Sequence, residues 1–228
     1  MKIVGIASSP HRNGNSVGLL REALKGAQEA GAETEEVYLP DYDITYCKGC
    51  MNCLSSDRCA IPDDLNRLRE KLVEADGLIL SSPTYGLAPN ARMKNFSDRI
   101  GMHSVYRSLL GDKYVAGIAT AGAVGARRTA RTLTSIADGF HRNGRVSGIL
   151  GVPVGHGDAA AALPEAHNLG RRMVNDIRTQ RKYPFQRLFE NLVRSVVLKR
   201  LMRKNVLENK DGAMKGVYEY WLAKGYIQ

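Results

Sequence analysis

The sequence lacks the patterns that mark three common classes of protein. Its 228 residues hold no run of about 18 apolar residues, the length that a membrane-spanning helix needs. They hold neither a G-x-G-x-x-G nor a G-x-x-x-x-G-K-[ST] pattern, which argues against a dinucleotide site and against a P-loop nucleotide site. The opening apolar stretch is too short for the core of a signal peptide. We therefore expect a soluble, cytoplasmic protein.

Cysteine is absent outside one short segment. All four cysteines, Cys47, Cys50, Cys53 and Cys59, follow a C-x2-C-x2-C-x5-C spacing. In a reducing cytosol, such crowding favours metal ligation or redox chemistry over disulfides. Soft thiolates select iron-sulfur clusters or zinc, and structural zinc usually takes two cysteine pairs with a longer spacer. The tight run therefore favours one [4Fe-4S] cluster, with zinc and unligated redox thiols as the alternatives.

Acidic residues are scarce in the last quarter of the chain. The net charge of the whole sequence is +10, and residues 171–215 hold 13 lysines and arginines against 4 acidic residues, a net of +9. Such a charge run is most often a solvated helical face or an oligomer contact. An acidic protein partner ranks next. Nucleic acid and an anionic membrane are the least favoured partners, since a basic stripe is only an electrostatic footprint.

Short apolar runs alternate with helical patterns along most of the chain. We predict five strands, at residues 2–7, 34–39, 77–82, 114–120 and 145–154, each separated by room for a helix. This alternation indicates an α/β domain over residues 1–182 with a doubly wound parallel sheet, and residues 183–228 are expected to form a basic helical extension. Ligands of such sheets sit outside the carboxyl ends of the strands. We therefore expect four loops to converge there on one crevice: residues 8–16, 47–59, 82–86 and 120–125.

The first of these loops has the composition of an anion site. Residues 8–16 put hydroxyls, an amide side chain, a glycine and a cation between the end of a strand and the start of a helix. Backbone N–H groups and the positive end of a helix dipole can then face a phosphate. The alternative is an ordinary strand-helix turn with a serine or asparagine cap.

Four motifs together carry a family resemblance. Residues 5–16 match G-I-x-x-S-P-x-x-x-G-N-[ST], residues 83–99 match P-x-Y followed by a helix of the type A-x-[LM]-K-x-F-x-D-R, and residues 120–125 are a run of small residues. With the cysteine motif placed after the second strand, the first 155 residues resemble the iron-sulfur flavoprotein family of the NADPH-dependent FMN reductase and flavodoxin-like superfamily. The resemblance implies a flavodoxin-like five-stranded sheet of order 2-1-3-4-5.

The resemblance also implies a set of cofactor contacts. Family members often carry arginine where this chain has His11, so the cationic contact to the FMN phosphate is expected to move to Arg12, and Gly86 stands where an aromatic residue often follows the tyrosine. The implied phosphate contacts are Ser9, His11, Arg12, Asn15 and Ser16. The implied contacts to the flavin ring are Pro83, Thr84, Tyr85, Gly86, Thr120, Ala121, Gly122 and Gly125. The implied cluster ligands are Cys47, Cys50, Cys53 and Cys59.

The expected function is that of an oxidoreductase or electron-transfer flavoprotein with FMN and a [4Fe-4S] cluster. A cluster passes single electrons, whereas FMN accepts one or two, so the pair can link a one-electron donor to a two-electron acceptor. The resemblance implies ferredoxin-type donors and an oligomer, expected to be a homodimer or homotetramer, in which the cluster of one subunit approaches the flavin of another. The net charge of +9 leads us to expect that an acidic ferredoxin-like donor docks on the basic extension. A small molecule is the expected acceptor. The alternatives are a cluster-free NAD(P)H-dependent FMN or quinone reductase and a non-catalytic redox carrier or sensor. No catalytic acid or base stands out, because the histidines His103, His141, His156 and His167 are scattered.

Overall fold

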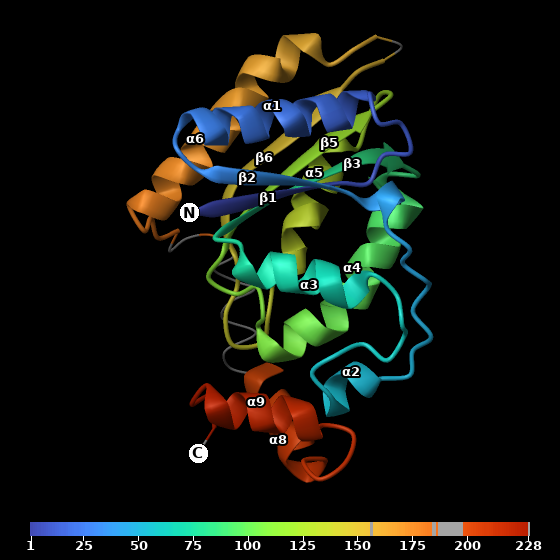
Figure 1. The fold of residues 1–228 in the computed structure, drawn as a ribbon, viewed down its shortest axis with the longest axis vertical. Coiled ribbons are helices and arrows are strands. Elements are labelled where there is room, and N and C mark those ends of the chain that lie inside the picture. Colours follow the sequence, from blue (N-terminus) through green and yellow to red (C-terminus); the bar gives the residue numbers. More distant parts are fainter. Residues whose placement is uncertain (156, 184–185, 187–197, 228) are drawn as a thin grey trace.

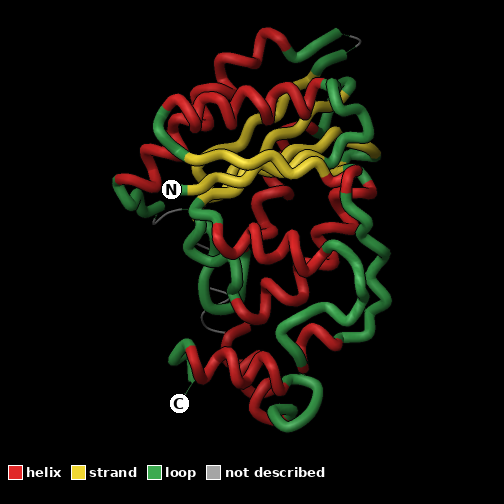
Figure 2. Tube along the Cα trace, viewed as in Figure 1, coloured by secondary structure: helices red, strands yellow, loops and turns green. Residues whose placement is uncertain are grey.

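The computed structural model describes residues 1–155, 157–183, 186 and 198–227. A parallel sheet with the order β2-β1-β3-β5-β6 lies at its centre (Figures 1 and 2). The strands are β1 (Lys2–Ala7), β2 (Glu33–Tyr38), β3 (Gly77–Tyr85), β5 (Tyr114–Ala121) and β6 (Arg145–Pro153). A sixth strand, β4 (Ala88–Pro89), pairs with the end of β3 in the antiparallel direction. The predicted doubly wound sheet and its strand order are confirmed, with the short β4 as an addition.

Helices cover both faces of the sheet. One face carries α1 (Asn15–Glu29) and α6 (Leu163–Arg178), and the other carries α3 (Leu65–Glu74), α4 (Ala91–Arg107) and α5 (Ala126–Thr134) (Figure 1). The remaining elements of the described residues are α2 (Asn52–Ser55), α8 (Lys199–Glu208), α9 (Lys215–Ala223) and three short 3-10 helices at Leu39–Asp41, Ser135–Ala137 and Ala160–Ala162. In the part of the chain that the structure describes, no helix is long and apolar enough to cross a membrane.

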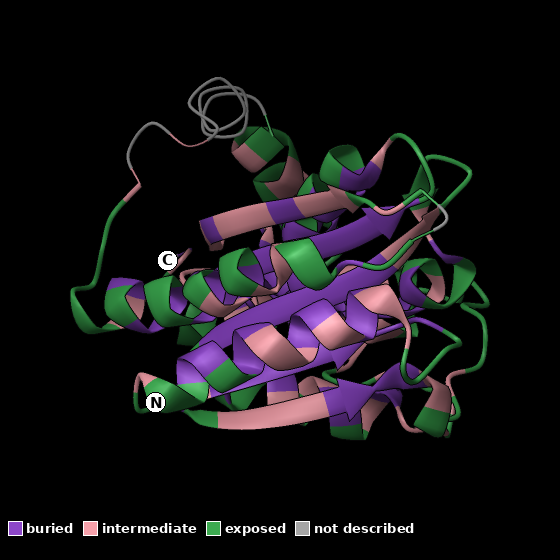
Figure 3. Ribbon diagram, turned by 90° about the horizontal axis from the view of Figure 1, so that it is seen from above, coloured by how far each residue is buried: buried purple, intermediate pink, exposed green. Residues whose placement is uncertain are grey.

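Strand β3 shows how the sheet separates two cores. Leu78, Ile79 and Leu80 are fully buried, but Ile79 packs among residues of α1 and α6, whereas Leu78 and Leu80 pack among residues of α3 and α4. Successive side chains of a strand point to opposite faces, so this pattern requires both faces to be covered. Figure 3 shows the buried strands between exposed helical surfaces.

Glycines allow α1 and α6 to pack backbone against backbone. A side chain at Gly26 would lie 2.1 Å from the carbonyl oxygen of His167, and one at Gly170 would lie 1.8 Å from that of Ala23. Both distances are far below van der Waals contact, so each helix needs glycine where it meets the other. This contact fixes α1, and with it the loop that precedes α1.

The C-terminal helices α8 and α9 form a small third core away from the sheet (Figure 1). Trp221 is 1% exposed, and its indole N–H donates to the carbonyl oxygen of Tyr106 on α4 at 2.7 Å. Val217 and Leu54 belong to the same core, which joins α9 to α2. The aromatic end of the chain therefore packs on its own domain. Residues 184–185 and 187–197 of the expected extension lie outside the described residues, and the domain boundary at residue 182 stays a prediction.

The basic segment does not form a single surface. Arg171, Arg172 and Arg178 lie on α6, which covers the sheet, whereas the remaining described lysines and arginines of the segment lie mainly on and around α8 and α9 at the other end of the molecule (Figure 1). Residues 198–227 alone carry seven basic and three acidic residues. The surface beside α2 is therefore basic, but much less so than the whole segment implies.

Candidate functional site

Asn90 ties together the carboxyl ends of β1 and β3. Its side-chain nitrogen donates to the carbonyl oxygen of Ser8 at 2.8 Å, and its backbone N–H donates to Oγ of Ser82 at 3.1 Å. Its side-chain oxygen accepts from the backbone N–H of Met93 at 3.1 Å, which caps α4. No motif marked Asn90, although asparagine before a helical pattern is a signal for an N-cap. One buried amide thus sets the spacing of two candidate cofactor loops.

The loop before α1 closes tightly on itself. Oγ of Ser9 accepts from the backbone N–H of His11 at 3.1 Å, and the N–H of Gly14 donates to the carbonyl oxygen of His11 at 3.0 Å. A side chain at Gly14 would lie 3.1 Å from that same oxygen. Among the described residues, no side chain caps the first turn of α1. The positive end of this 15-residue helix therefore opens onto the loop, as an anion site requires.

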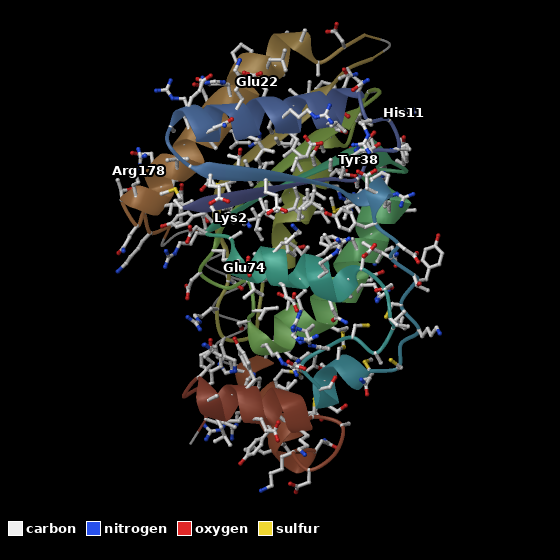
Figure 4. The ribbon with its side chains drawn as sticks, viewed as in Figure 1. Lys2, His11, Glu22, Tyr38, Glu74 and Arg178 are labelled. Carbon is white, nitrogen blue, oxygen red and sulfur yellow. The ribbon has the colours of Figure 1, made fainter. Side chains whose placement is uncertain are left out.

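The two candidate cations of this loop lie near its tip. His11 is exposed, and Figure 4 labels it at the same end of the sheet as Tyr38. The guanidinium of Arg12 is paired with Asp41 and lies 4.2 Å above the ring centre of Tyr38. About half of the Arg12 side chain is exposed, so a bound anion would compete with Asp41 for it.

Asn15 and Ser16 serve the loop through contacts within the protein. The side-chain oxygen of Asn15 accepts from the backbone N–H of Ala159 at 3.1 Å, and its nitrogen donates to the carbonyl oxygen of Gly157 at 3.3 Å. Ser16 is buried, and its carbonyl oxygen accepts from Oγ of Ser81 at 2.6 Å. Asn15 therefore joins the loop before α1 to the segment after β6.

The loops after β3 and β5 lie against each other. A side chain at Gly125 would lie 3.4 Å from Cγ2 of Thr84 and 3.1 Å from Leu87, and Gly125 has a φ of +93°. Oγ1 of Thr84 is buried and has no hydrogen-bond partner among the described residues. Buried hydroxyls normally have a hydrogen-bond partner, so this one is free to bond a polar group of a ligand or a water molecule. Among the predicted ring contacts, Thr84 is thus the one whose buried hydroxyl has no partner in the described part of the chain.

Exposed apolar side chains lie at the same carboxyl edge of the sheet. Tyr85 is 54% exposed, Leu87 53% and Val124 70%. Pro83 precedes them on β3, and Gly86 has a φ of +56° that lets the chain turn back into β4. Exposed apolar groups that gather on one surface indicate a binding site for a flat ring or for another chain.

Small residues lie at the end of β5, at this edge of the sheet. Thr120 and Ala121 are buried, at 6% and 5% exposure, and the carbonyl oxygens of Ala121 and Gly122 accept from the backbone N–H groups of Val154 and Gly155, each at 2.8 Å. The loops after β1, β3, β5 and β6 are thus connected to one another by hydrogen bonds and close contacts along the edge. A ligand could approach the backbone closely here because bulky side chains are missing.

The cysteine loop lies elsewhere. The expectation that it would meet the other three loops in one crevice is wrong for a single chain, because residues 43–59 run along α4, away from the edge of the sheet, toward α2 and α9 (Figure 1). The cysteine loop and the flavin-type loops therefore form two sites that α4 connects.

All four cysteines line one pocket of about 310 Å³, together with Arg99 and Met102 among others. Cys47 and Cys50 are exposed, and Cys53 and Cys59 are partly buried, all as free thiols. Among the described residues, no three His, Cys, Asp or Glu side chains converge as they would around one metal ion.

The chemistry of the four thiols in this pocket fits a bound cationic group. Burial raises the pKa of Cys53, and the charges of Cys59, Cys50 and Cys47 raise it further, whereas Arg107 lowers it. Four thiolates around one pocket repel one another unless positive charge lies among them. The donor set therefore fits a group that carries positive charge and prefers thiolate ligands, as an iron-sulfur cluster or zinc does.

A stripe of polar side chains on α4 holds the backbone of the cysteine loop. Its members recur at every fourth residue and therefore share one face of the helix: Asn95, Arg99, His103 and Arg107. Asn95 donates to the carbonyl oxygen of Ile44 at 2.9 Å. Arg107 donates to those of Cys53 and Ser56 at 2.8 and 2.6 Å. Nε2 of His103 lies 2.7 Å from the carbonyl oxygen of Asp57. We name these four residues the α4 stripe.

Cys59 has the most contacts of the four cysteines. Its backbone N–H donates to the side-chain oxygen of Asn66 at 3.1 Å, and its carbonyl oxygen accepts from the nitrogen of the same amide at 3.0 Å. Arg99 donates to its sulfur, Sγ, at 3.3 Å and forms an ion pair with Asp63. Burial acts against the charged form of Asp63, but hydrogen bonds from Arg99, Leu65 and Thr45 leave its pKa below the ordinary value.

Of the four scattered histidines, the three that are described have structural roles. His103 belongs to the α4 stripe, and burial, with Arg107 and Arg69 nearby, lowers its pKa to about 3. His141 stacks on Tyr226 with ring centres 4.1 Å apart. Nδ1 of His167 lies 2.8 Å from Glu22, which Figure 4 labels on α1. His156 lies outside the described residues.

The comparisons with known proteins agree with this geometry. Residues 1–161 match the NADPH-dependent FMN reductase family. The chain is 32% identical to an iron-sulfur flavoprotein of Archaeoglobus fulgidus over 236 aligned positions, which cover all of both chains. A flavone reductase is similar in structure over 78% of this chain and 63% of its own, with a TM-score of 0.62 and 23% identity. A flavodoxin from the domain Archaea is similar over 78% and 99%, with a TM-score of 0.52 and 15% identity. The chain is thus a flavin-dependent oxidoreductase with a flavodoxin-like fold, and it belongs to the iron-sulfur flavoproteins of the NADPH-dependent FMN reductase family.

Proposed function

We propose that the protein binds one FMN and one [4Fe-4S] cluster and moves electrons between a one-electron donor and a two-electron acceptor. One observation carries this proposal above the others: four cysteines line one pocket into which a buried arginine donates a hydrogen bond to sulfur. When bound, the cluster supplies single electrons and the flavin exchanges one or two, so together they convert between the two kinds of transfer.

The FMN would bind at the carboxyl edge of the sheet. The N–H groups at the start of α1 and the hydroxyl of Ser9 would hold the phosphate, with His11 and Arg12 as nearby cations. Thr84 and Tyr85 would contact the ring from β3, and Gly125 would let the loop after β5 approach it. The remaining predicted contacts border these: Asn15, Ser16, Pro83, Gly86, Thr120, Ala121 and Gly122.

The cluster would bind to Cys47, Cys50, Cys53 and Cys59. The α4 stripe would keep the loop in the shape that the cluster needs, and positive charge from Arg99 and Arg107 would offset the negative charge of four thiolates. Cys47 and Cys50 are exposed, so this side of the cluster would face the solvent or a partner.

Cofactor content tests the proposal directly. Anaerobically purified protein should contain about four iron, four acid-labile sulfide and one FMN per chain. Cys59→Ala should lose most of the iron and keep the FMN, because Cys59 lies apart from the carboxyl edge of the sheet. Ser55→Ala should retain both, because it removes a hydroxyl that donates to the carbonyl oxygen of Asn52 within the short helix α2. Anaerobic protein with FMN and no iron would contradict the cluster.

A cluster-free NAD(P)H-dependent reductase is the second candidate, favoured by the family to which residues 1–161 belong. In that case NADPH alone should sustain turnover of a quinone or of free FMN, and Cys59→Ala should turn over as fast as the wild type. If neither NADPH nor a ferredoxin-like donor supported turnover of any acceptor, although the flavin could still be reduced and reoxidised, the protein would be better described as a carrier or sensor.

The proposed donor is a ferredoxin-like protein with an acidic surface, docked on α8 and α9. Arg200 and Arg203 are exposed there, and α9 packs on α2, which carries Cys53. Complementary charge mainly speeds encounter and is screened by salt. Reversing both arginines to glutamate should slow reduction by such a donor at low salt. The same change at Arg171 and Arg172, on α6 at the other end of the molecule, should not.

We also propose that the protein assembles as a homodimer or homotetramer. The exposed Tyr85, Leu87 and Val124 at the flavin edge, and the exposed Tyr46 and Met51 on the cysteine loop, support contact between copies at both sites. Such contact would bring the cluster of one subunit to the flavin of another, although the two sites lie apart within one chain. Sedimentation of the loaded protein should give a mass above 25.0 kDa.

A further inference from the structure

We propose that Arg99 and Asp63 form a buried pair that sets the reduction potential of the cluster, with Arg99 raising it through a hydrogen bond to Cys59 and Asp63 lowering it. The inference rests on the proposed function, because it concerns the [4Fe-4S] cluster. It makes Arg99 a positioning and tuning residue whose effect reaches the cluster through one ligand sulfur.

The geometry of the pair leaves it little freedom. The side chains of Arg99 and Asp63 are 1% and 2% exposed. Nη1 of Arg99 lies 2.8 Å from Oδ2 of Asp63, and Nη2 lies 3.0 Å from Oδ1. The same Nη2 donates to Sγ of Cys59 at 3.3 Å. One guanidinium nitrogen thus joins the carboxylate and the thiol sulfur.

Asp63 is fixed from its other side by the backbone. Its oxygens also accept from the N–H groups of Thr45 at 3.0 Å and Leu65 at 3.1 Å, just before the cysteine loop and just after it. Arg99 in turn donates to the carbonyl oxygen of Thr45. The pair therefore closes the base of the loop while it holds a charged N–H against a ligand sulfur.

The effect on potential follows from charge. When the donor passes one electron to the cluster, the cluster becomes more negative by one unit, and no bond or proton changes at Arg99. A buried cation and an N–H directed at sulfur stabilise the more negative state, so they raise the potential. A buried carboxylate destabilises that state and lowers the potential. Removal of each partner should therefore shift the potential in opposite directions.

A merely structural role predicts a different result. If the pair only closed the loop, Arg99→Gln and Asp63→Asn would both loosen it, and their effects would have the same sign. Opposite signs therefore separate electrostatic tuning from structural support. Lys94→Gln is a matched control, because Lys94 lies on the same helix and its ion pair with Asp98 is exposed to solvent.

The test is an anaerobic redox titration of the cluster in full-length, FMN-loaded protein, followed by electron paramagnetic resonance. Arg99→Gln should lower the equilibrium constant for one-electron reduction of the cluster at least tenfold, which is a downward shift of its potential by at least about 59 mV. Asp63→Asn should shift the potential upward, Arg99→Lys should lie between Arg99→Gln and the wild type, and Lys94→Gln should match the wild type.

Each outcome decides the question. Shifts of the same sign in Arg99→Gln and Asp63→Asn, or shifts no larger than that of Lys94→Gln, would overturn the inference. If Arg99→Gln fails to hold iron, Asp63→Asn decides: an upward shift supports the tuning role, and any other result overturns it. A wild-type protein without iron would instead overturn the proposed function, and the inference with it.

Discussion

At the scale of single residues, a few buried polar side chains determine how the loops lie. Asn90 supports the carboxyl edge of the sheet, where FMN is proposed to bind, and the α4 stripe supports the cysteine loop. Most buried polar groups in proteins have hydrogen-bond partners, and these side chains supply such partners to loop backbone at Ser8, Ile44 and Asp57. Their loss should therefore affect cofactor binding as well as stability.

Asn90→Ala should weaken FMN binding about tenfold. The change removes the N-cap of α4, worth about 1 kcal/mol, and it also releases the carbonyl oxygen of Ser8 at the start of the phosphate loop. Titration of the apoprotein with FMN, followed by quenching of flavin fluorescence, measures the affinity. Asn95→Ala, on the same helix but bonded to Ile44, should bind FMN like the wild type. Equal affinity in Asn90→Ala and Asn95→Ala would contradict this role.

His103 should make the folded apoprotein sensitive to mild acid. Its pKa falls from 6.5 to about 3 on folding because burial and two arginines disfavour its charged form. Below pH 6.5 the unfolded chain binds a proton that the folded chain does not, so the free energy of unfolding should fall by about 1.4 kcal/mol per pH unit until about pH 3.

Urea unfolding at pH 7 and pH 5.5, followed by the fluorescence of Trp221, measures this loss. His103→Gln should reduce the pH dependence. It should not abolish it, because burial also lowers the pKa of His141, to about 4, which acts in the same direction. A variant that loses stability as steeply as the wild type would exclude His103 as a cause.

At the scale of elements, α9 acts as a support for the cysteine loop. A side chain at Gly216 would lie 2.8 Å from the carbonyl oxygen of Ser55 and 2.9 Å from the guanidinium of Arg107. Helix α9 can therefore approach α2 only through this glycine. Because α2 carries Cys53, the C-terminal helices help to fix one of the proposed cluster ligands.

Gly216→Ala should push α9 away from α2, destabilise the protein by about 1–3 kcal/mol and speed the loss of iron to a chelator. Iron release is followed by the absorbance of the chelate under anaerobic conditions. Gly212→Ala is the matched control, because a side chain there meets nothing within 4 Å. The same release rate in both variants would show that α9 does not support the cysteine loop.

The elements also show how far the sequence can predict this protein. The strands could be found because their apolar runs are buried on both faces, as Leu78 to Leu80 are in β3. The α4 stripe could not be recognised, because polar residues at every fourth position of a helix ordinarily mark its solvent face, whereas Arg99, His103 and Arg107 are at most 4% exposed. The docking of Trp221 on α4 depends on residues far apart in sequence, which local patterns do not encode.

At the scale of the whole molecule, α4 links the two candidate sites. Its cap, Asn90, holds the flavin edge, and Arg99, nine residues later, contacts Cys59. At about 1.5 Å of rise per residue, the two lie roughly 13 Å apart along the helix. The cysteine motif and the phosphate loop were both recognisable in the sequence. That they lie apart in one chain was not, because the path of residues 43–59 depends on long-range contacts with α4.

The number of electrons that one chain accepts tests most directly whether it carries two redox groups. Anaerobic titration of the loaded protein with dithionite should consume about three electrons per chain, two at the flavin and one at the cluster, and about two in Cys59→Ala. Two electrons per chain in both proteins would contradict the account, because the wild type would then hold a flavin and no working cluster.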